Sequence, residues 1–126
     1  MSSDRQYVPN SSFEKLRIWH DARRLTRRIY ELTAEQPFRS DFSLRDQMRR
    51  AMLSVMSNIA EGYEREGRKE LLYFLRVAKG SAAELRSQLY AAEDLGYATP
   101  ERAALLRREV LRLTRQIAAF ANSAKA

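Results

Sequence analysis

Apolar residues recur along this chain at steps of three and four positions, which is the spacing of one face of an α-helix. The pattern appears four times and predicts helices over residues 13–35, 44–61, 68–95 and 100–121. No segment shows the alternation of apolar and polar residues that is typical of a half-buried strand. The apolar stripes that we expect to form the core are Ile18, Ala22, Leu25, Ile29 and Leu32; Leu44, Met48, Met52, Val55 and Ile59; Leu71, Phe74, Leu75, Ala78, Ala82, Leu85 and Leu89; and Ala103, Leu106, Val110, Leu113, Ile117 and Phe120.

Capping residues, glycines and prolines stand where these helices should begin and end. Ser11 and Glu14 form a capping box at the start of the first helix, and Ser43 is placed to cap the second. Gly62 follows the second apolar stripe and is expected to end that helix. Thr99 precedes a proline and a glutamate, a combination typical of a helix N-terminus.

Four helices joined by short loops favour an antiparallel arrangement, because loops of about 3–8 residues leave successive helices side by side. We therefore predict an all-α protein, an antiparallel up-down-up-down four-helix bundle of residues 11–121. Residues 1–10 are expected to form a flexible arm and residues 122–126 a C-terminal tail. A length of 126 residues supports one domain.

The composition excludes several kinds of catalytic and metal site. Cysteine is absent, which excludes disulfides, thiol catalysis and cysteine-ligated metals. His20 is the single histidine, so a metal site built on several histidines is excluded as well. The sequence contains neither a glycine-rich phosphate loop nor a nucleophile elbow. We expect no cofactor, no metal and no enzymatic activity.

The net charge of +7 comes mostly from arginine, a side chain suited to paired contacts with phosphate. This charge favours a polyanionic partner, although it could also serve only to keep the protein soluble. On a helical projection, arginines of the first and fourth helices lie away from the apolar stripes. First and fourth helices are neighbours in an antiparallel bundle, so we expect one nucleic-acid-binding surface, the alternative being two solvated exteriors. Its residues are Arg17, Arg24, Arg28, Arg108, Arg112 and Arg115.

The second and third helices carry small and apolar residues outside their core stripes. Small residues let another helix approach closely, and exposed apolar patches often mark interfaces. We therefore favour self-association, the alternative being a helix that tolerates small surface residues. The predicted oligomer-interface residues are Leu53, Met56, Tyr73, Gly80, Ala83, Ser87 and Tyr90.

The end of the second helix holds a polar motif of Asn58, Glu61 and Gly62. Asn58 borders the apolar stripe, where its amide could bond loop backbone or, alternatively, contact a ligand. Glu61 is expected to pair with an arginine. We favour a structural role for all three residues.

Several strings of residues connect this chain with a known family. They are Phe13, Leu16, Trp19, Ala22 and Tyr30; 44–51 and Ser54; 58–62; and 73–75, 78–81, 84–85 and 95–97. On these residues the chain resembles the four-helix-bundle family of 23S rRNA intervening-sequence proteins. The resemblance implies a bundle that assembles into a ring-like homopentamer, in a family whose activity is not established. It extends to related accessory variability proteins, which assist reverse transcriptases in diversity-generating retroelements through a basic surface.

Two functions stay open at this point. The first is an oligomer that binds structured RNA or an RNA–DNA intermediate through phosphate contacts. The alternative is a protein-interaction scaffold, or an accessory subunit of a polymerase or reverse transcriptase, without direct nucleic-acid contact. No apolar run approaches the roughly 20 residues that cross a bilayer. Residues 1–9 also lack the apolar core of a signal peptide, so we expect a cytoplasmic protein without membrane contact.

Overall fold

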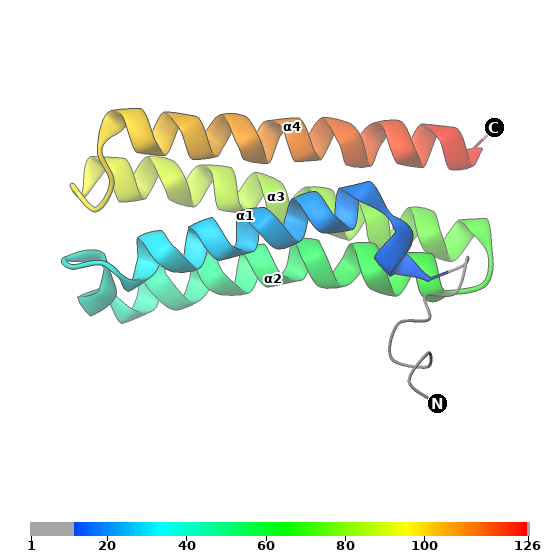
Figure 1. Ribbon diagram of the computed structural model, residues 1–126, viewed down its shortest axis with the longest axis horizontal. Helices are drawn as coiled ribbons and strands as arrows, with labels where there is room; N and C mark the ends of the chain where they lie inside the picture. The colour runs from blue at the N-terminus through cyan, green and yellow to red at the C-terminus, as the bar shows by residue number, and fades with distance from the viewer. Residues whose placement is uncertain (1–11, 126) are drawn as a thin grey trace, which may run out of the picture.

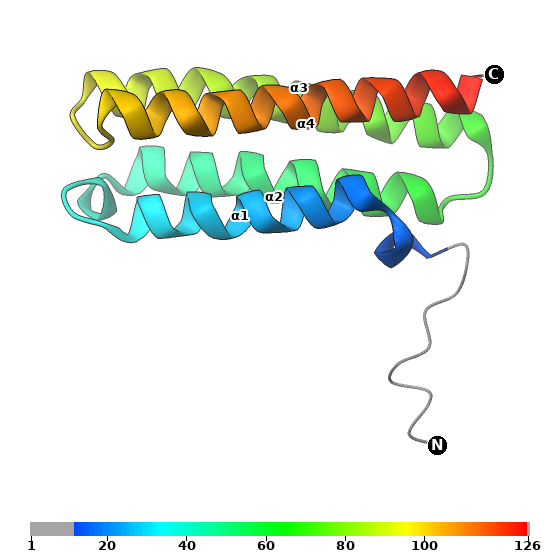
Figure 2. The same cartoon turned by 45° about the horizontal axis from the view of Figure 1, so that its top comes forward.

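Four long helices make up the computed structural model, which describes residues 12–125. The elements in chain order are the 3₁₀ turn η2 (Phe13–Lys15), α1 (Arg17–Ala34), the 3₁₀ turn η3 (Phe38–Ser40), α2 (Phe42–Glu64), α3 (Arg68–Asp94) and α4 (Pro100–Lys125). Successive helices run in opposite directions (Figure 1), and α3 and α4 lie over α1 and α2 (Figure 2). The predicted all-α four-helix bundle is confirmed, and residues 12–125 contain no strand.

The core is formed by the apolar stripes that the residue spacing predicts. In α1 the whole stripe is buried, with Ile29 and Leu32 fully enclosed. Most stripe residues of the other three helices are also buried. Leu44, Leu71 and Phe120 are partly buried at the edges of the cluster, and Phe74, expected in the core, is only half-buried. Burying this apolar area is the main favourable term in folding. No helix within the described ranges is long and apolar enough to cross a membrane.

The second helix is capped by Asp41, and the prediction of Ser43 is wrong. The Asp41 carboxylate accepts from the Leu44 backbone N–H at 3.1 Å, so the helix begins at Phe42. The second Asp41 oxygen accepts from the Tyr97 hydroxyl at 2.9 Å, which raises the pKa of Tyr97. Ser43 instead accepts from the Gln47 side chain, one turn into the helix.

The outer ends of α1 and α4 differ from the predicted boundaries. Ser11, the expected first cap, lies outside the described residues, and Ser12 accepts from the Glu14 backbone N–H instead. Extended backbone at Leu16 separates this turn from α1, which begins at Arg17 rather than at residue 13. At the other end α4 continues through most of the predicted tail to Lys125. Residues 122–125 contain no glycine or proline to stop the helix, and they include helix-favouring alanine and lysine.

Gly62 does not end the second helix, which continues to Glu64. It is buried where α2 crosses α3, and a Cβ at this position would lie 2.8 Å from the Cβ of Phe74. The absence of a side chain lets the two helices come close together, so Gly62 is a packing residue. The turn into α3 is made by Gly67 instead, whose φ of 111° is open to glycine and unfavourable for other residues.

The polar residues before Gly62 form hydrogen bonds and an ion pair, both within α2 and between α2 and α3. Asn58 donates to the Ser54 carbonyl at 2.8 Å rather than to loop backbone, so that expectation is wrong. The Ser54 hydroxyl lies 2.7 Å from that of Ser81, which joins α2 to α3 through a hydrogen bond. Glu61 pairs with an arginine as expected, Arg65, at 2.8 Å.

Replacing Gly62 with alanine should lower the free energy of unfolding by about 1–3 kcal/mol, because the added methyl group forces α2 away from Phe74. The matched control is Gly80→Ala, where a Cβ would meet no atom of the same chain within 4 Å. Since alanine favours helix more than glycine, the control should gain up to about 1 kcal/mol. Urea unfolding measures both changes. Equal effects of the two substitutions would contradict the packing role of Gly62.

Candidate functional site

A groove of about 220 Å³ runs between α1 and α4 and contains most of the predicted basic residues. Its floor is apolar, formed by Leu25 and Leu113 of the core. Four of the six arginines predicted from the sequence line it. The lining residues are Arg17, Asp21, Arg24, Leu25 and Arg28 from α1, and Glu109, Arg112, Leu113 and Gln116 from α4.

The rotation of α1 and α4 about their own axes explains this placement. Each residue advances a helix by about 100°, so side chains flanking the buried stripe on one side of α1 all point toward α4. Glu109, Arg112 and Gln116 occupy the facing flank of α4. Arg108 and Arg115 are exposed on α4 but lie further round and do not line the groove. The predicted surface is therefore divided between a groove and an open helix face.

Two carboxylates inside the groove engage part of the positive charge. Asp21 forms an ion pair with Arg24, and Glu109 forms one across the groove with Arg28. The Nε atom of Arg17 is 4.0 Å from the other Asp21 oxygen, at the limit of an ion pair, and the Arg17 side chain is 81% exposed. The groove holds four arginines and two carboxylates, for a net charge of +2.

Arg112 differs from the other arginines of the groove. Within the part of the chain that the structure describes, it has neither an ion pair nor a side-chain hydrogen bond, and it lines the groove from α4. The unpaired guanidinium of Arg112 and the loosely held one of Arg17 keep hydrogen-bond donors available for an anion. Arg17 and Arg112 are thus the groove residues best placed to bind a phosphate.

An ion pair that could not be predicted from the sequence joins the end of α1 to the start of α4. Arg102 donates to both carboxylate oxygens of Glu35, at 2.6 and 2.9 Å. The hydrogen bond holds the pKa of Glu35 below its usual value and raises that of Arg102. The partners are 67 positions apart, so residue spacing along one helix gives no signal of their pairing.

Arg107 of α4 turns toward α3 and away from the groove. Its guanidinium donates to Glu93 at 2.8 Å and lies 3.9 Å from the ring centre of Tyr90. These two contacts tie α4 to α3, so Arg107 acts in packing and contributes nothing to the groove.

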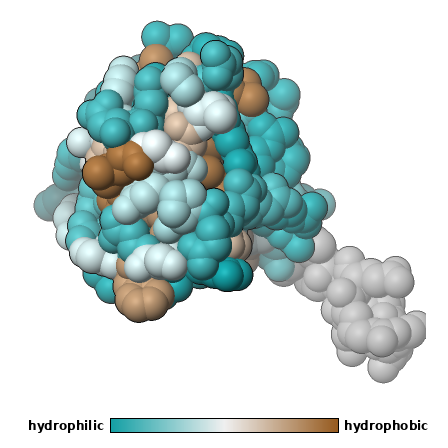
Figure 3. Space-filling model, turned by 90° about the vertical axis from the view of Figure 1, so that its left-hand side faces the viewer, coloured by the Kyte–Doolittle hydropathy of each residue, from teal (hydrophilic) through white to brown (hydrophobic). Residues whose placement is uncertain are grey.

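The residues predicted for self-association fall into two separate groups. Those on α3 are exposed and share its outer face: Tyr73, Gly80, Ala83, Ser87 and Tyr90. On α2, Leu53 is exposed, but Met56 is half-buried against the core and its Sδ accepts from the Thr26 hydroxyl of α1. The expectation that Met56 forms an outer patch is therefore wrong, because this flank of α2 faces α1. The end of the bundle seen in Figure 3 is mostly hydrophilic, with small apolar spots.

A second hollow lies between α2 and α3 and is polar. Its lining residues are Gln47, Arg50, Ala51, Ser54, Ser81 and Glu84. Nearby, the buried Gln88 donates to Glu84 at 3.4 Å, while its side-chain oxygen has no partner.

Residues 12–125 contain no group of three or more histidines or carboxylates that could hold a metal ion. His20 bonds the Glu14 carbonyl at 2.8 Å.

Comparison with known proteins gives the fold a family context. The family model of the 23S rRNA-intervening sequence protein matches residues 14–119. A similar solved structure is a protein of unknown function from the S23 ribosomal protein family of Bacteroides thetaiotaomicron, with a TM-score of 0.76. The alignment is 18% identical and covers 82% of this chain and 97% of that one, so it supports the fold alone. No curated protein matches the sequence.

Proposed function

The chain belongs to the family of 23S rRNA-intervening sequence proteins, and from this premise we propose that it is a non-enzymatic module that binds the nucleic-acid phosphate backbone. The binding site is the groove between α1 and α4, and the ligand is structured RNA or an RNA–DNA intermediate. The observation that carries the proposal is that Arg17 and Arg112 both line this groove, Arg112 without an ion pair and Arg17 with only a 4.0 Å contact to Asp21. The family description, which refers to 23S rRNA, favours RNA among polyanions.

Guanidinium groups suit this role because their planar donors can bind two phosphate oxygens at once. Arg24 and Arg28 are already paired with carboxylates, so a phosphate must compete with Asp21 and Glu109 for them. Contacts of this kind position the backbone without reading base sequence. We therefore expect binding that depends steeply on salt and only weakly on sequence.

Self-association completes the proposal. The α3 face of Tyr73, Gly80, Ala83, Ser87 and Tyr90 is exposed, and small side chains at its centre would let a helix of another copy approach closely. The family resemblance implies five copies. Several grooves in one assembly would bind a long nucleic acid at high effective concentration, and this compensates for the modest charge of each groove.

A double variant, Arg17→Gln with Arg112→Gln, should weaken the binding of an RNA hairpin. Each lost phosphate contact flattens the slope of log affinity against log salt by about 0.7–0.9, so the pair should flatten it by between one and two. The fold should be retained, because surface substitutions typically change stability by about 0.5 kcal/mol or less. Fluorescence anisotropy at several salt concentrations measures the slope.

The matched control for this prediction is Arg76→Gln with Arg86→Gln, which removes the same charge from α3. If both double variants lose affinity equally, bulk charge explains binding and the groove assignment is wrong. If the parent binds neither RNA hairpin, single strand nor duplex at low salt, nucleic acid is not the ligand. Salt-insensitive capture of a polymerase or reverse transcriptase would then favour the scaffold function.

Replacing Ala83 with arginine should dissociate the oligomer, because a long charged side chain would be placed in the centre of the α3 face. Helicity should be unchanged, since Ala83 is exposed. Native mass spectrometry measures the assembly, and circular dichroism the helix content. A monomeric parent protein would contradict self-association.

A further inference from the structure

The side of the bundle formed by α1 and α2 carries three arginines stacked over aromatic rings. Arg23 lies 5.7 Å from the ring centre of Trp19, both on α1. The guanidinium of Arg49 on α2 lies 4.4 Å from the ring centre of Tyr30 on α1. Near the start of α2, Arg45 lies 4.9 Å from the ring centre of Phe42. We call these six residues the α1–α2 face.

The three pairs follow one another along the bundle. Trp19 and Tyr30 are eleven positions apart on α1, about 16 Å at the rise of an α-helix. Phe42 lies beyond Tyr30, where α2 begins after η3. Successive unstacked bases can reach platforms spaced along such a line, because single strands are extensible.

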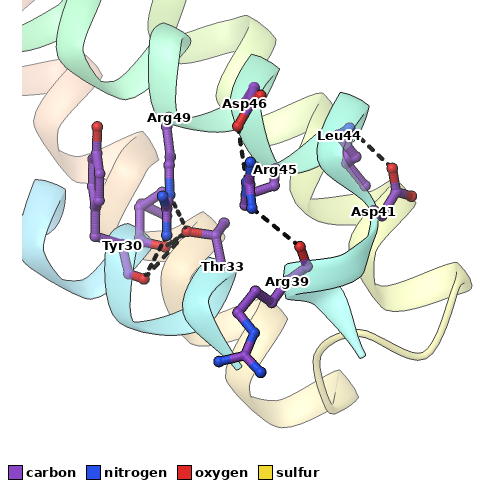
Figure 4. A network of polar contacts seen from close by, with 9 residues as sticks. Tyr30, Thr33, Arg39, Asp41, Leu44, Arg45, Asp46 and Arg49 are labelled. Carbon is purple, nitrogen blue, oxygen red and sulfur yellow. Dashed lines mark hydrogen bonds and ion pairs between the residues drawn. The ribbon is translucent and has the colours of Figure 1, made fainter. Parts of the chain in front are cut away.

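Hydrogen bonds hold two of these guanidinium groups, those of Arg45 and Arg49, in place (Figure 4). Arg49 donates from Nε to the Thr33 hydroxyl at 2.8 Å, and Thr33 in turn donates to the Ile29 carbonyl. Arg45 donates to Asp46 at 2.8 Å and to the Arg39 carbonyl at 3.2 Å. Held in this way, each guanidinium plane has already lost conformational entropy on folding, and Asp46 offsets part of the positive charge of Arg45.

Exposure along this side suits a ligand with flat aromatic groups. Phe42 is 64% exposed despite its arginine neighbour, and Leu53 is exposed as well. Trp19 and Tyr30 are half-buried, and the Trp19 ring also lies edge-on to Phe13 and His20, at 4.8 and 5.1 Å between ring centres, so both rings are anchored in the bundle. Arg23 and Arg27 are exposed on the same flank or next to it and add positive charge.

We propose that the α1–α2 face binds single-stranded nucleic acid by stacking unpaired bases on these rings and guanidinium planes. Base stacking on aromatic residues and on arginine, beside a positive surface, is the general means of single-strand recognition. In a duplex the bases already stack on each other, so only the backbone phosphates are available to the protein. A protein partner would require an apolar centre, whereas here a guanidinium group flanks each ring. This site lies beyond the groove between α1 and α4 and does not rest on it.

Trp19 is the only tryptophan and reports directly on this surface. A 20-nucleotide oligothymidylate should quench its fluorescence as bases stack beside it, and a duplex of equal length should quench it much less. Oligoglutamate of similar charge should have little effect. Absence of quenching by oligothymidylate at low salt, or equal quenching by oligoglutamate, would overturn the proposal.

Two substitutions at Phe42 separate stacking from apolar contact. Phe42→Tyr keeps the ring and should keep the affinity for oligothymidylate. Phe42→Leu keeps apolar bulk without a ring and should lower that affinity about tenfold, near the low end of what one stacked base contributes. If Phe42→Leu binds as tightly as the parent, the ring is not a stacking platform and the proposal fails.

The double variant Arg17→Gln with Arg112→Gln distinguishes this site from the groove. It should weaken duplex binding while oligothymidylate still quenches Trp19. If the variant binds duplex as tightly as the parent and oligothymidylate still quenches Trp19, the groove does not bind phosphates, whereas single-strand binding at the α1–α2 face is supported. Loss of quenching in this variant, with the fold intact, would assign single-strand binding to the groove and overturn the proposal.

Discussion

The burial of four apolar stripes in one core is the constraint on which the rest of this structure depends. Each helix must turn its stripe inward, and that rotation decides where every charged side chain lies. On α1 and α4 it directs one flank of each helix toward the other, above a floor of Leu25 and Leu113. The arginines of the groove are therefore brought together as a consequence of hydrophobic packing, with no dedicated binding loop.

The same rotation determines which contacts the other flanks of the helices make. The second flank of α1 meets α2, where arginines stack on Trp19, Tyr30 and Phe42. The contact between α2 and α3 uses small and polar residues instead, with Gly62 against Phe74 and Ser54 bonded to Ser81. The outer face of α3, directed away from the core, is exposed and has small residues at its centre. The bundle thus presents three distinct surfaces around one core: the groove between α1 and α4, the α1–α2 face, and the outer face of α3.

Helical spacing was sufficient to predict the fold class, the core and the outward direction of the arginines, because these follow from each helix alone. Contacts between helices could not be predicted in this way. Nothing in the spacing shows that Glu109 reaches Arg28 or that Glu35 reaches Arg102. Gly62 illustrates the limit well, since a glycine after an apolar stripe indicates a helix end as readily as a close helix contact. Its role depends on Phe74, which comes from the facing helix.

The central claim is that Arg17 and Arg112 contact phosphates in the groove between α1 and α4. It is tested most directly by following the arginine Nε–H signals in a nuclear magnetic resonance titration with an RNA hairpin. The account predicts that the signals of Arg17 and Arg112 shift along one saturation curve, while the signal of Arg76 on α3 stays in place. An Arg76 signal that shifts as much as those of Arg17 and Arg112 would contradict it. So would signals of Arg17 and Arg112 that do not move when the RNA hairpin is added.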